Sequence, residues 1–266
     1  MHSSITSYPR AGTDDDLFCR LAEYITMFNK GWINKIKPAS KEQIFELKKV
    51  LRLEEIYKQE LPKSYEIFLS TMGNNDGGLL SGSYVGSTDI ESIIELNRDF
   101  HEFPEPNEGA CFPFIAGTVQ QYAFDFNGKH LENVVMTDCA KVVCVKSENF
   151  EKFLFQSAYF QFERYTFHRL FVATSNNIKT KTQRADLGDV FEVVLAVAGN
   201  VTEKHGLKKV WFSDFNNYIA LGDGISFRIQ RVDKKGAAYG SVSGNNQETV
   251  EDILNILVDI LGFENR

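Results

Sequence analysis

The sequence predicts an α+β protein in which helices and antiparallel strands form two successive domains. Helical periodicity dominates the first 72 residues. Between residues 111 and 145, short apolar segments alternate with turn residues, as strands of a sheet do. A second group of such segments, from residue 210 to 242, is enclosed by one helical pattern before it and another after it. These three patterns predict two sheets, each packed with helices.

Two helices are expected before residue 60. The run Thr-Asp-Asp-Asp at 13–16 places acidic side chains at the positive end of a helix that continues to about residue 30. Ser40 is a suitable N-cap for a second helix. Its apolar positions continue a helical period to about Tyr57, so we expect this helix to end there.

A third helix is expected to begin at Pro62, because proline suits the first turn, where no N–H is needed. Its apolar residues recur at i, i+3, i+4 and i+7 and form one face: Tyr65, Phe68, Leu69 and Met72. The run Gly-Asn-Asn-Asp-Gly-Gly at 73–78 permits positive φ and ends the helix. Gly77 and Gly78 could also cradle an anion, but a helix end followed by a turn explains them more simply.

Short strands and two helices follow the turn. A helix at 89–97, capped by Thr88 or Asp89, precedes an acidic loop at 101–110. Ser147 is expected to cap a closing helix that extends to about Phe160. The expected strands are 79–80, 84–85, 111–116, 122–126, 134–136 and 141–145.

The last third of the chain predicts an antiparallel meander flanked by helices. Residues 171–185 are polar and basic and are interpreted as a linker. A helix is expected at 186–203, and Asn246 is expected to cap the final helix. The expected strands between them are 210–212, 218–221, 225–232 and 238–242.

The third helix also carries a family resemblance. Residues 61–69 read Leu-Pro-x-x-Tyr-x-x-Phe-Leu before the Asn/Gly turn, which resembles the signature of the SMI1/KNR4 (SUKH) superfamily. A Phe-Pro-Phe strand, a Phe-Asp-Phe strand, Val-rich strands and a Ser-x-x-Phe-x-x-Phe-Leu helix follow in the order of that family. The resemblance covers about residues 30–165. It departs at 116–121, where relatives often have a Gly/Asp-rich loop, and at Asp138-Cys139, where a His-Glu pair is common.

The resemblance and the helical patterns predict three parts of the chain. Residues 1–29 form an N-terminal segment with a helix, and residues 30–170 form a SUKH-like domain, with a mixed or antiparallel sheet packed against helices. Residues 186–266 form a second, smaller α+β domain that resembles no family we recognise.

Acidic residues are concentrated in one quarter of the chain. The net charge of the protein is −7, yet residues 73–138 alone contain eleven acidic and two basic side chains. The remainder of the chain has a balance of +2. Because nucleic-acid binding requires a basic surface, this distribution argues against nucleic acid and in favour of a basic protein partner.

Composition also bears on location. No segment has the length and apolarity of a membrane span, and residues 1–5 lack the pattern of a signal peptide. The four cysteines form no CxxC pair, so we expect reduced thiols and a cytoplasmic protein without a membrane partner.

No constellation in the sequence predicts catalysis, a cofactor or a metal. The five histidines are isolated from one another and from nucleophile motifs, and phosphate-loop or dinucleotide fingerprints are absent. Glu102, Glu105 and Glu108 lie in a loop stiffened by prolines. They could bind Ca²⁺, remain solvated or face a protein, but their spacing is not that of an EF-hand. We therefore expect no enzyme activity.

The SUKH resemblance implies a non-enzymatic binding protein. Bacterial members of that superfamily mostly act as immunity proteins, which neutralise a cognate polymorphic toxin, often a nuclease. An acidic inhibitor surface would complement the basic surface of a nuclease. The residues expected to bind the toxin are Asp76, Asp99, Glu102, Glu105 and Glu108. Two alternatives remain: a regulatory or scaffold protein of the SMI1/KNR4 type with another protein partner, and an enzyme with an unrecognised site.

Overall fold

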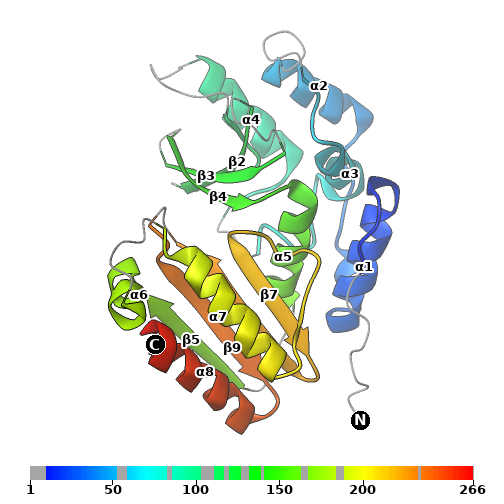
Figure 1. Ribbon diagram of the computed structural model, residues 1–266. Helices are drawn as coiled ribbons and strands as arrows, with labels where there is room; N and C mark the ends of the chain where they lie inside the picture. Colours follow the sequence, from blue (N-terminus) through cyan, green and yellow to red (C-terminus); the bar gives the residue numbers. More distant parts are fainter. Residues whose placement is uncertain are drawn as a thin grey trace. The chain divides into compact units, whose positions relative to one another are not determined.

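The chain folds into two compact units, residues 9–163 and residues 164–266. Each unit contains one antiparallel sheet and several helices, so the predicted α+β class is confirmed (Figure 1). The computed structural model describes residues 10–52, 59–82, 86–102, 111–116, 120–126, 132–138, 141–162, 167–183, 189–232 and 235–265.

The 9–163 unit combines helices with a sheet of strand order β1-β2-β3-β4. In this unit α2 packs against α4, and α1 packs against α3 and α5. Its helices are η1 (Asp14–Asp16), α1 (Leu17–Phe28), η2 (Trp32–Asn34), α2 (Lys41–Leu51), α3 (Lys63–Met72), α4 (Ile90–Glu102) and α5 (Phe150–Phe162). Its strands are β1 (Cys111–Pro113), β2 (Gln120–Asp125), β3 (Val134–Asp138) and β4 (Lys141–Ser147).

An aromatic cluster forms the centre of this unit. The four apolar residues predicted to face inward from α3 are buried, with Tyr65 at the centre. Five phenylalanine rings lie within 5.9 Å of the Tyr65 ring, centroid to centroid: Phe68, Phe112, Phe114, Phe124 and Phe150. They come from α3, β1, β2, α5 and the segment after β1. Burying one such side chain contributes about 1.5–3 kcal/mol, so this cluster holds the sheet and the helices together.

Helix α2 begins as predicted and ends earlier. Ser40 and Gln43 form a capping box, in which the Gln43 N–H donates to Ser40 Oγ and the Ser40 N–H donates to Gln43 Oε1. Arg52 then adopts a left-handed conformation with φ 50°, which stops the helix at Leu51. The expected end at Tyr57 is therefore wrong, and Tyr57 itself lies outside the described residues.

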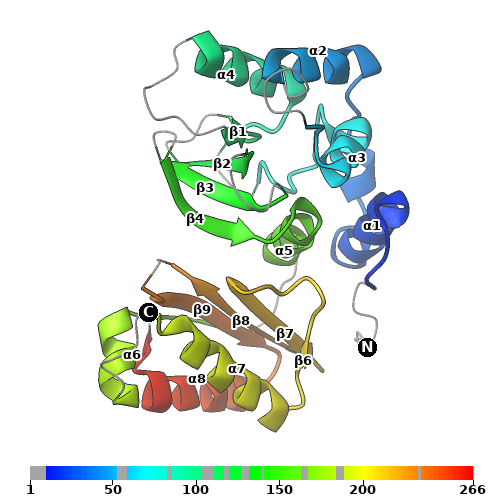
Figure 2. The same cartoon turned by 45° about the horizontal axis from the view of Figure 1, so that its top comes forward.

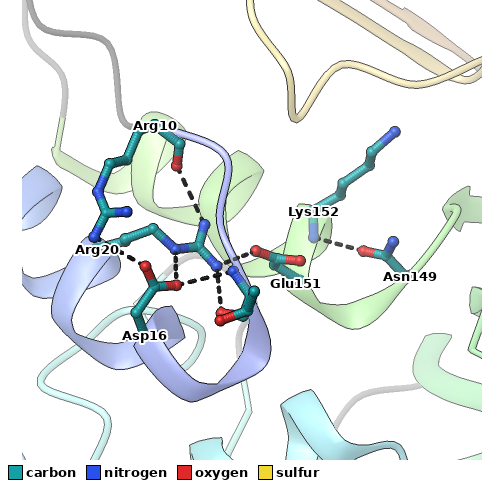
Figure 3. Close-up of polar contacts among 7 residues, drawn as sticks. Arg10, Asp16, Arg20, Asn149, Glu151 and Lys152 are labelled. Atoms are coloured by element: carbon teal, nitrogen blue, oxygen red, sulfur yellow. Dashed lines mark hydrogen bonds and ion pairs between the residues drawn. The ribbon is translucent and has the colours of Figure 1, made fainter.

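Other boundaries also differ from expectation. Leu79 and Leu80 lie in a bend instead of a strand. Helix α4 extends to Glu102, so it includes two residues expected in the acidic loop. Helix α5 is capped by Asn149, whose Oδ1 accepts the Lys152 N–H at 2.8 Å (Figure 3), while Ser147 ends β4.

A buried arginine ties the N-terminal segment to α5. Arg20 in α1 is 1% exposed, and its guanidinium donates to the carbonyl oxygens of Arg10 and Thr13. The same guanidinium donates to Asp16 Oδ1 at 2.6 Å and to Glu151 Oε1 at 2.5 Å (Figure 3). The hydrogen bond from Arg20 lowers the pKa of Asp16.

The expected separation of residues 1–29 from the following domain is therefore wrong for the part that the structure describes. Residues 10–28 belong to the same compact unit as α5. The sequence predicted the helix α1 but gave no sign that Arg20 would be buried, because an arginine on a helix is usually exposed.

The 164–266 unit contains a second antiparallel sheet with strand order β10-β5-β9-β8-β7-β6. Helices α6, α7 and α8 lie on one face of this sheet (Figures 1 and 2). The helices are α6 (Ser175–Thr182), α7 (Phe191–Lys204) and α8 (Gln247–Leu261). The strands are β5 (Phe167–Ala173), β6 (Lys208–Lys209), β7 (Asn217–Gly222), β8 (Ile225–Arg231), β9 (Ala238–Gly244) and β10 (Glu264–Asn265).

The interpretation of residues 171–185 as a linker is wrong for residues 171–183, the part that the structure describes. Strand β5 pairs along its whole length with β9, and α6 follows it directly. Phe171, Ala173 and Ile178 are buried in the core of the second unit, so residues 171–183 are part of its fold. The division between the units consequently lies between 163 and 164, earlier than the predicted limits at 170 and 186.

The meander itself is largely as predicted. Strands β7, β8 and β9 are connected in order and pair in antiparallel register. Asn246 caps α8 through a hydrogen bond from the Thr249 N–H, at 3.2 Å. Residues 210–212 do not form a strand: Trp211 and Phe212 lie in a turn, and the short β6 ends just before Val210.

Replacing Tyr65 with Phe tests the aromatic cluster. Among the described residues, the buried Tyr65 hydroxyl has no hydrogen-bond partner, which costs free energy. We expect Tyr65→Phe to leave the free energy of unfolding unchanged or to raise it by about 1 kcal/mol in urea titration. As a control, Phe150→Ala is expected to lower it by about 3–5 kcal/mol. A loss of more than about 1 kcal/mol in Tyr65→Phe would contradict this account.

The second unit is expected to lose stability in mild acid. Burial lowers the pKa of both His168 and His205, so the fold favours the neutral imidazoles. The stabilisation is complete at pH values above about 6.5, the pKa of histidine in the unfolded chain. It decreases as the pH falls below that pKa. Urea titration at pH 7.5 and at pH about 5.5 should show this loss. The variant His205→Asn should show a smaller loss, and an equal loss would contradict a contribution from His205.

Candidate functional site

The structure describes the side chains of two of the five predicted partner-binding residues, Asp76 and Asp99, and places them in different surroundings. Asp76 is buried, whereas Asp99 is exposed on α4. Glu102 is the last residue of α4, and the structure does not describe its side chain. Glu105 and Glu108 lie outside the described residues, so their proposed role stays a prediction.

The prediction that Asp76 binds a partner is wrong, because its carboxylate is used inside the fold. The side chain is 1% exposed. Its Oδ1 accepts hydrogen bonds from the Gly78 N–H and the Ser81 hydroxyl, at 2.9 and 2.6 Å. Its Oδ2 accepts from the N–H groups of Leu80 and Ser81 and from the Thr88 hydroxyl, at 2.7, 2.9 and 3.0 Å. A carboxylate with five donors is a structural centre of the turn.

The turn around Asp76 also excludes an anion cradle at the two glycines. The Gly77 N–H donates to Asn75 Oδ1, and the Gly78 N–H donates to Asp76, so both amides are occupied. Gly77 has φ +66°, and a Cβ atom there would lie 2.6 Å from the Trp32 ring. The Trp32 indole N–H in turn donates to the Asp76 carbonyl oxygen at 3.0 Å. Glycine is required here for close packing.

Helix α4 presents a row of exposed carboxylates, which we call the α4 acidic row. It consists of Glu91, Glu95 and Asp99, which are spaced four residues apart and therefore lie along one side of the helix. Ile90, Ile93, Ile94 and Asn97 point inward and are buried. The acidic row is thus the outer face of a helix whose inner face belongs to the core.

Two members of the row were missed by the sequence interpretation, which selected Asp99 but not Glu91 or Glu95. All three lie in the acidic segment 73–138. The helical period of the buried isoleucines would have placed them together, since residues at i and i+4 are neighbours on a helix.

Contacts with α2 neutralise part of the charge beside the row. Arg98 Nη2 pairs with Glu46 Oε1 at 2.8 Å, so the positive charge of the single arginine of α4 is offset by an acid of α2. Gln43 Nε2 donates to Glu91 Oε1 at 2.6 Å. Within the described residues, Glu95 and Asp99 make no ion pair, so their charges face solvent. The outer face of α4 is therefore anionic.

Helix α4 is held by a cap at its start and by a buried side chain further along. Asp89 caps it by accepting from the Ser92 N–H at 3.1 Å. Burial raises the pKa of Asp89, but hydrogen bonds from Ser87 and Ser92 lower it overall. Further along, Asn97 Nδ2 donates to the carbonyl oxygen of Pro113 in β1, at 3.0 Å. The acidic row is consequently held on a rigid support.

The described residues offer few other sites of chemistry. Within the ranges that the structure covers, no three His, Cys, Asp or Glu side chains are grouped as metal ligands. Among the same residues, none of the helices combines the length and apolarity needed to cross a membrane.

Comparison with known proteins gives no relative: no family model, no curated protein and no solved structure matches the chain. The SUKH resemblance therefore stays a prediction that depends on the motifs in residues 30–165 alone.

Substitution of the two predicted aspartates should separate folding from surface chemistry. Five groups donate hydrogen bonds to the Asp76 carboxylate, and Asp76→Asn replaces one of its two acceptor oxygens with a donor group. Hydrogen bonds to a charged group contribute about 1.5–3 kcal/mol each. We expect urea titration to show a loss of about 3 kcal/mol or more. The matched variant Asp99→Asn, on the exposed face of α4, should stay within about 0.5 kcal/mol of the unaltered protein. Equal stability of the two variants would contradict the structural role of Asp76.

Proposed function

We propose that the chain is a non-enzymatic binding protein whose 9–163 unit engages a basic protein partner through the α4 acidic row. The observation that carries the proposal is the alignment of Glu91, Glu95 and Asp99 on the exposed side of a capped and anchored helix. Charges presented on a rigid element keep their positions and thus discriminate between partners.

The distribution of charge between the two units supports this assignment. Residues 9–163 contain 24 acidic and 16 basic side chains, a net charge of −8, while residues 164–266 contain 12 acidic and 13 basic ones. The unit that contains α4 therefore accounts for the negative charge of the protein. Such a field accelerates the encounter with a basic surface, and the acceleration decreases as salt increases.

The resemblance to the SUKH superfamily suggests the nature of the partner. We propose a bacterial immunity protein that neutralises a cognate toxin domain, such as a nuclease, in the cytoplasm of the producing cell. A nuclease presents basic side chains to its substrate, and an acidic inhibitor can cover them. The alternative is a regulatory or scaffold protein that uses the same surface for a basic partner other than a toxin.

Co-expression tests the proposal directly. The test requires a neighbouring gene that encodes a large secreted protein, whose toxic C-terminal domain is then co-expressed with this chain. We expect cells that express this domain to survive only when the unaltered chain is present. Reversing the row with Glu91→Lys, Glu95→Lys and Asp99→Lys should abolish survival, because the new charges repel a basic surface. The readout is the number of surviving colonies.

A matched control reverses three exposed acids of the other unit, Glu192, Glu203 and Glu248, and should keep full protection. Equal death with and without the unaltered chain would show that it is not an immunity protein for this toxin. Full protection by the reversed α4 variant would show that another surface binds.

A further inference from the structure

The outer side of α2 carries an exposed aromatic ring between two lysines. Phe45 is 70% exposed, whereas the other exposed large apolar side chains of the described residues reach at most 47%. Lys41 and Lys49 lie one helical turn before and after it, and both are exposed. We call these three residues the α2 outer row. It lies on a different side of the helix from Leu47 and Leu51, which are buried.

The α2 outer row takes no part in the contacts between α2 and the rest of its unit. Gln43 and Glu46, which contact α4, lie on another side of the helix. Lys48 pairs with an acid of α3. Within the described residues, Lys41 and Lys49 make no ion pair. The two charges and the ring between them therefore face solvent in a single copy of the chain.

The stability of α2 does not account for the composition of this row. Lys41 is the first residue of the helix, where a positive charge opposes the helix dipole. The ring of Phe45 leaves its apolar surface in water. Only Lys49, in the last turn, has a charge that favours the helix. A contact with another molecule accounts for the other two residues.

The α4 acidic row has the charge and the spacing that match the α2 outer row. Glu91 and Asp99 are eight residues apart, as are Lys41 and Lys49, so each pair of charges spans about 12 Å along its helix. The like charges of the acidic row, spaced at i and i+4, repel one another, and cations placed over them relieve that repulsion. The two rows are complementary in charge and equal in length.

We propose that the α2 outer row of one copy of the chain binds the α4 acidic row of a second copy. The lysines pair with the acids at the two ends of the row. Phe45 packs on Leu96, which is partly exposed on α4, and turns its positive ring edge toward the Glu95 carboxylate. This inference goes beyond the proposed function, because it assigns a second surface and a different occupant.

Pairing between copies regulates access to the α4 acidic row. A row that is covered by a second copy is hidden from a basic partner, so the two binding events compete by mass action. Each exposed ion pair contributes little, and we therefore expect a dissociation constant on the order of 0.1–1 mM. Such weak pairing yields to any partner that binds the acidic row more tightly.

Sedimentation equilibrium of the purified full chain measures the pairing in the absence of any other protein. At an ionic strength of about 0.15 M the Debye length is about 8 Å, so the repulsion between copies of net charge −7 is largely screened. We expect the weight-average mass to rise with protein concentration. Phe45→Ala should weaken the association about tenfold, because the buried aromatic contact is lost.

Charge reversal on each helix identifies the two surfaces. Lys41→Glu with Lys49→Glu gives a chain with two acidic rows, and Glu95→Lys with Asp99→Lys gives a chain with two basic ones. We expect each variant alone to remain monomeric, because its rows repel each other. In an equal mixture every acidic row can face a basic one, so association should return to within about threefold of that of the unaltered chain.

A matched control reverses two exposed lysines of the other unit. Lys208→Glu with Lys209→Glu changes the net charge as much as the reversal on α2 does, and it should leave the association constant within about twofold. Urea titration should show that the reversed variants keep the stability of the unaltered protein, because only exposed side chains are changed.

Three results would overturn the pairing between copies. The first is an unaltered chain that stays monomeric up to about 1 mM. The second is a mixture of the two reversed variants that does not associate. The third is a loss of association in the control as large as that in the α2 reversal. The proposed function is tested separately, since these measurements contain no toxin domain and its own test is survival of co-expressing cells.

Discussion

The buried carboxylate of Asp76 is the interaction on which the candidate surface depends. Burying a charge is costly unless every acceptor position is occupied, and here three backbone amides and two hydroxyls occupy them. These donors determine the path of the chain between α3 and α4. One of them, Thr88, stands directly before the Asp89 cap of α4. The orientation of the outer face of α4 thus follows from the satisfaction of one buried charge.

The turn around Asp76 and the aromatic cluster stabilise the 9–163 unit in different ways. The rings around Tyr65 supply apolar burial without direction, while the hydrogen bonds of Asp76 and Arg20 are directional and define how segments meet. Apolar burial therefore explains why α3 is held against the sheet. The polar contacts explain why α1 and α4 have the positions that they do.

Sequence reasoning found the elements whose signal is local and missed the features that depend on tertiary context. The inward face of α3 and the Asn246 cap were predictable, because helical periodicity and capping depend on residues that are close together in the sequence. An aspartate in an acidic segment is usually exposed, so the burial of Asp76 was not predictable from its neighbours. Strand β5 was missed because the polar residues of α6 follow it and together they resemble a linker.

The side chain of Gln43 limits how the α4 acidic row could be imitated by a peptide or changed by substitution. One amide group begins α2, contacts the turn at Asn74 and reaches Glu91 on α4. The α4 acidic row is accordingly supported by a contact from α2, and a synthetic peptide copied from α4 alone would lack that contact. In contrast, Glu95 and Asp99 take no part in these contacts and can diversify at little cost to folding. Substitutions at these two positions would change the charge of the outer face of α4 and leave its supporting contacts unchanged.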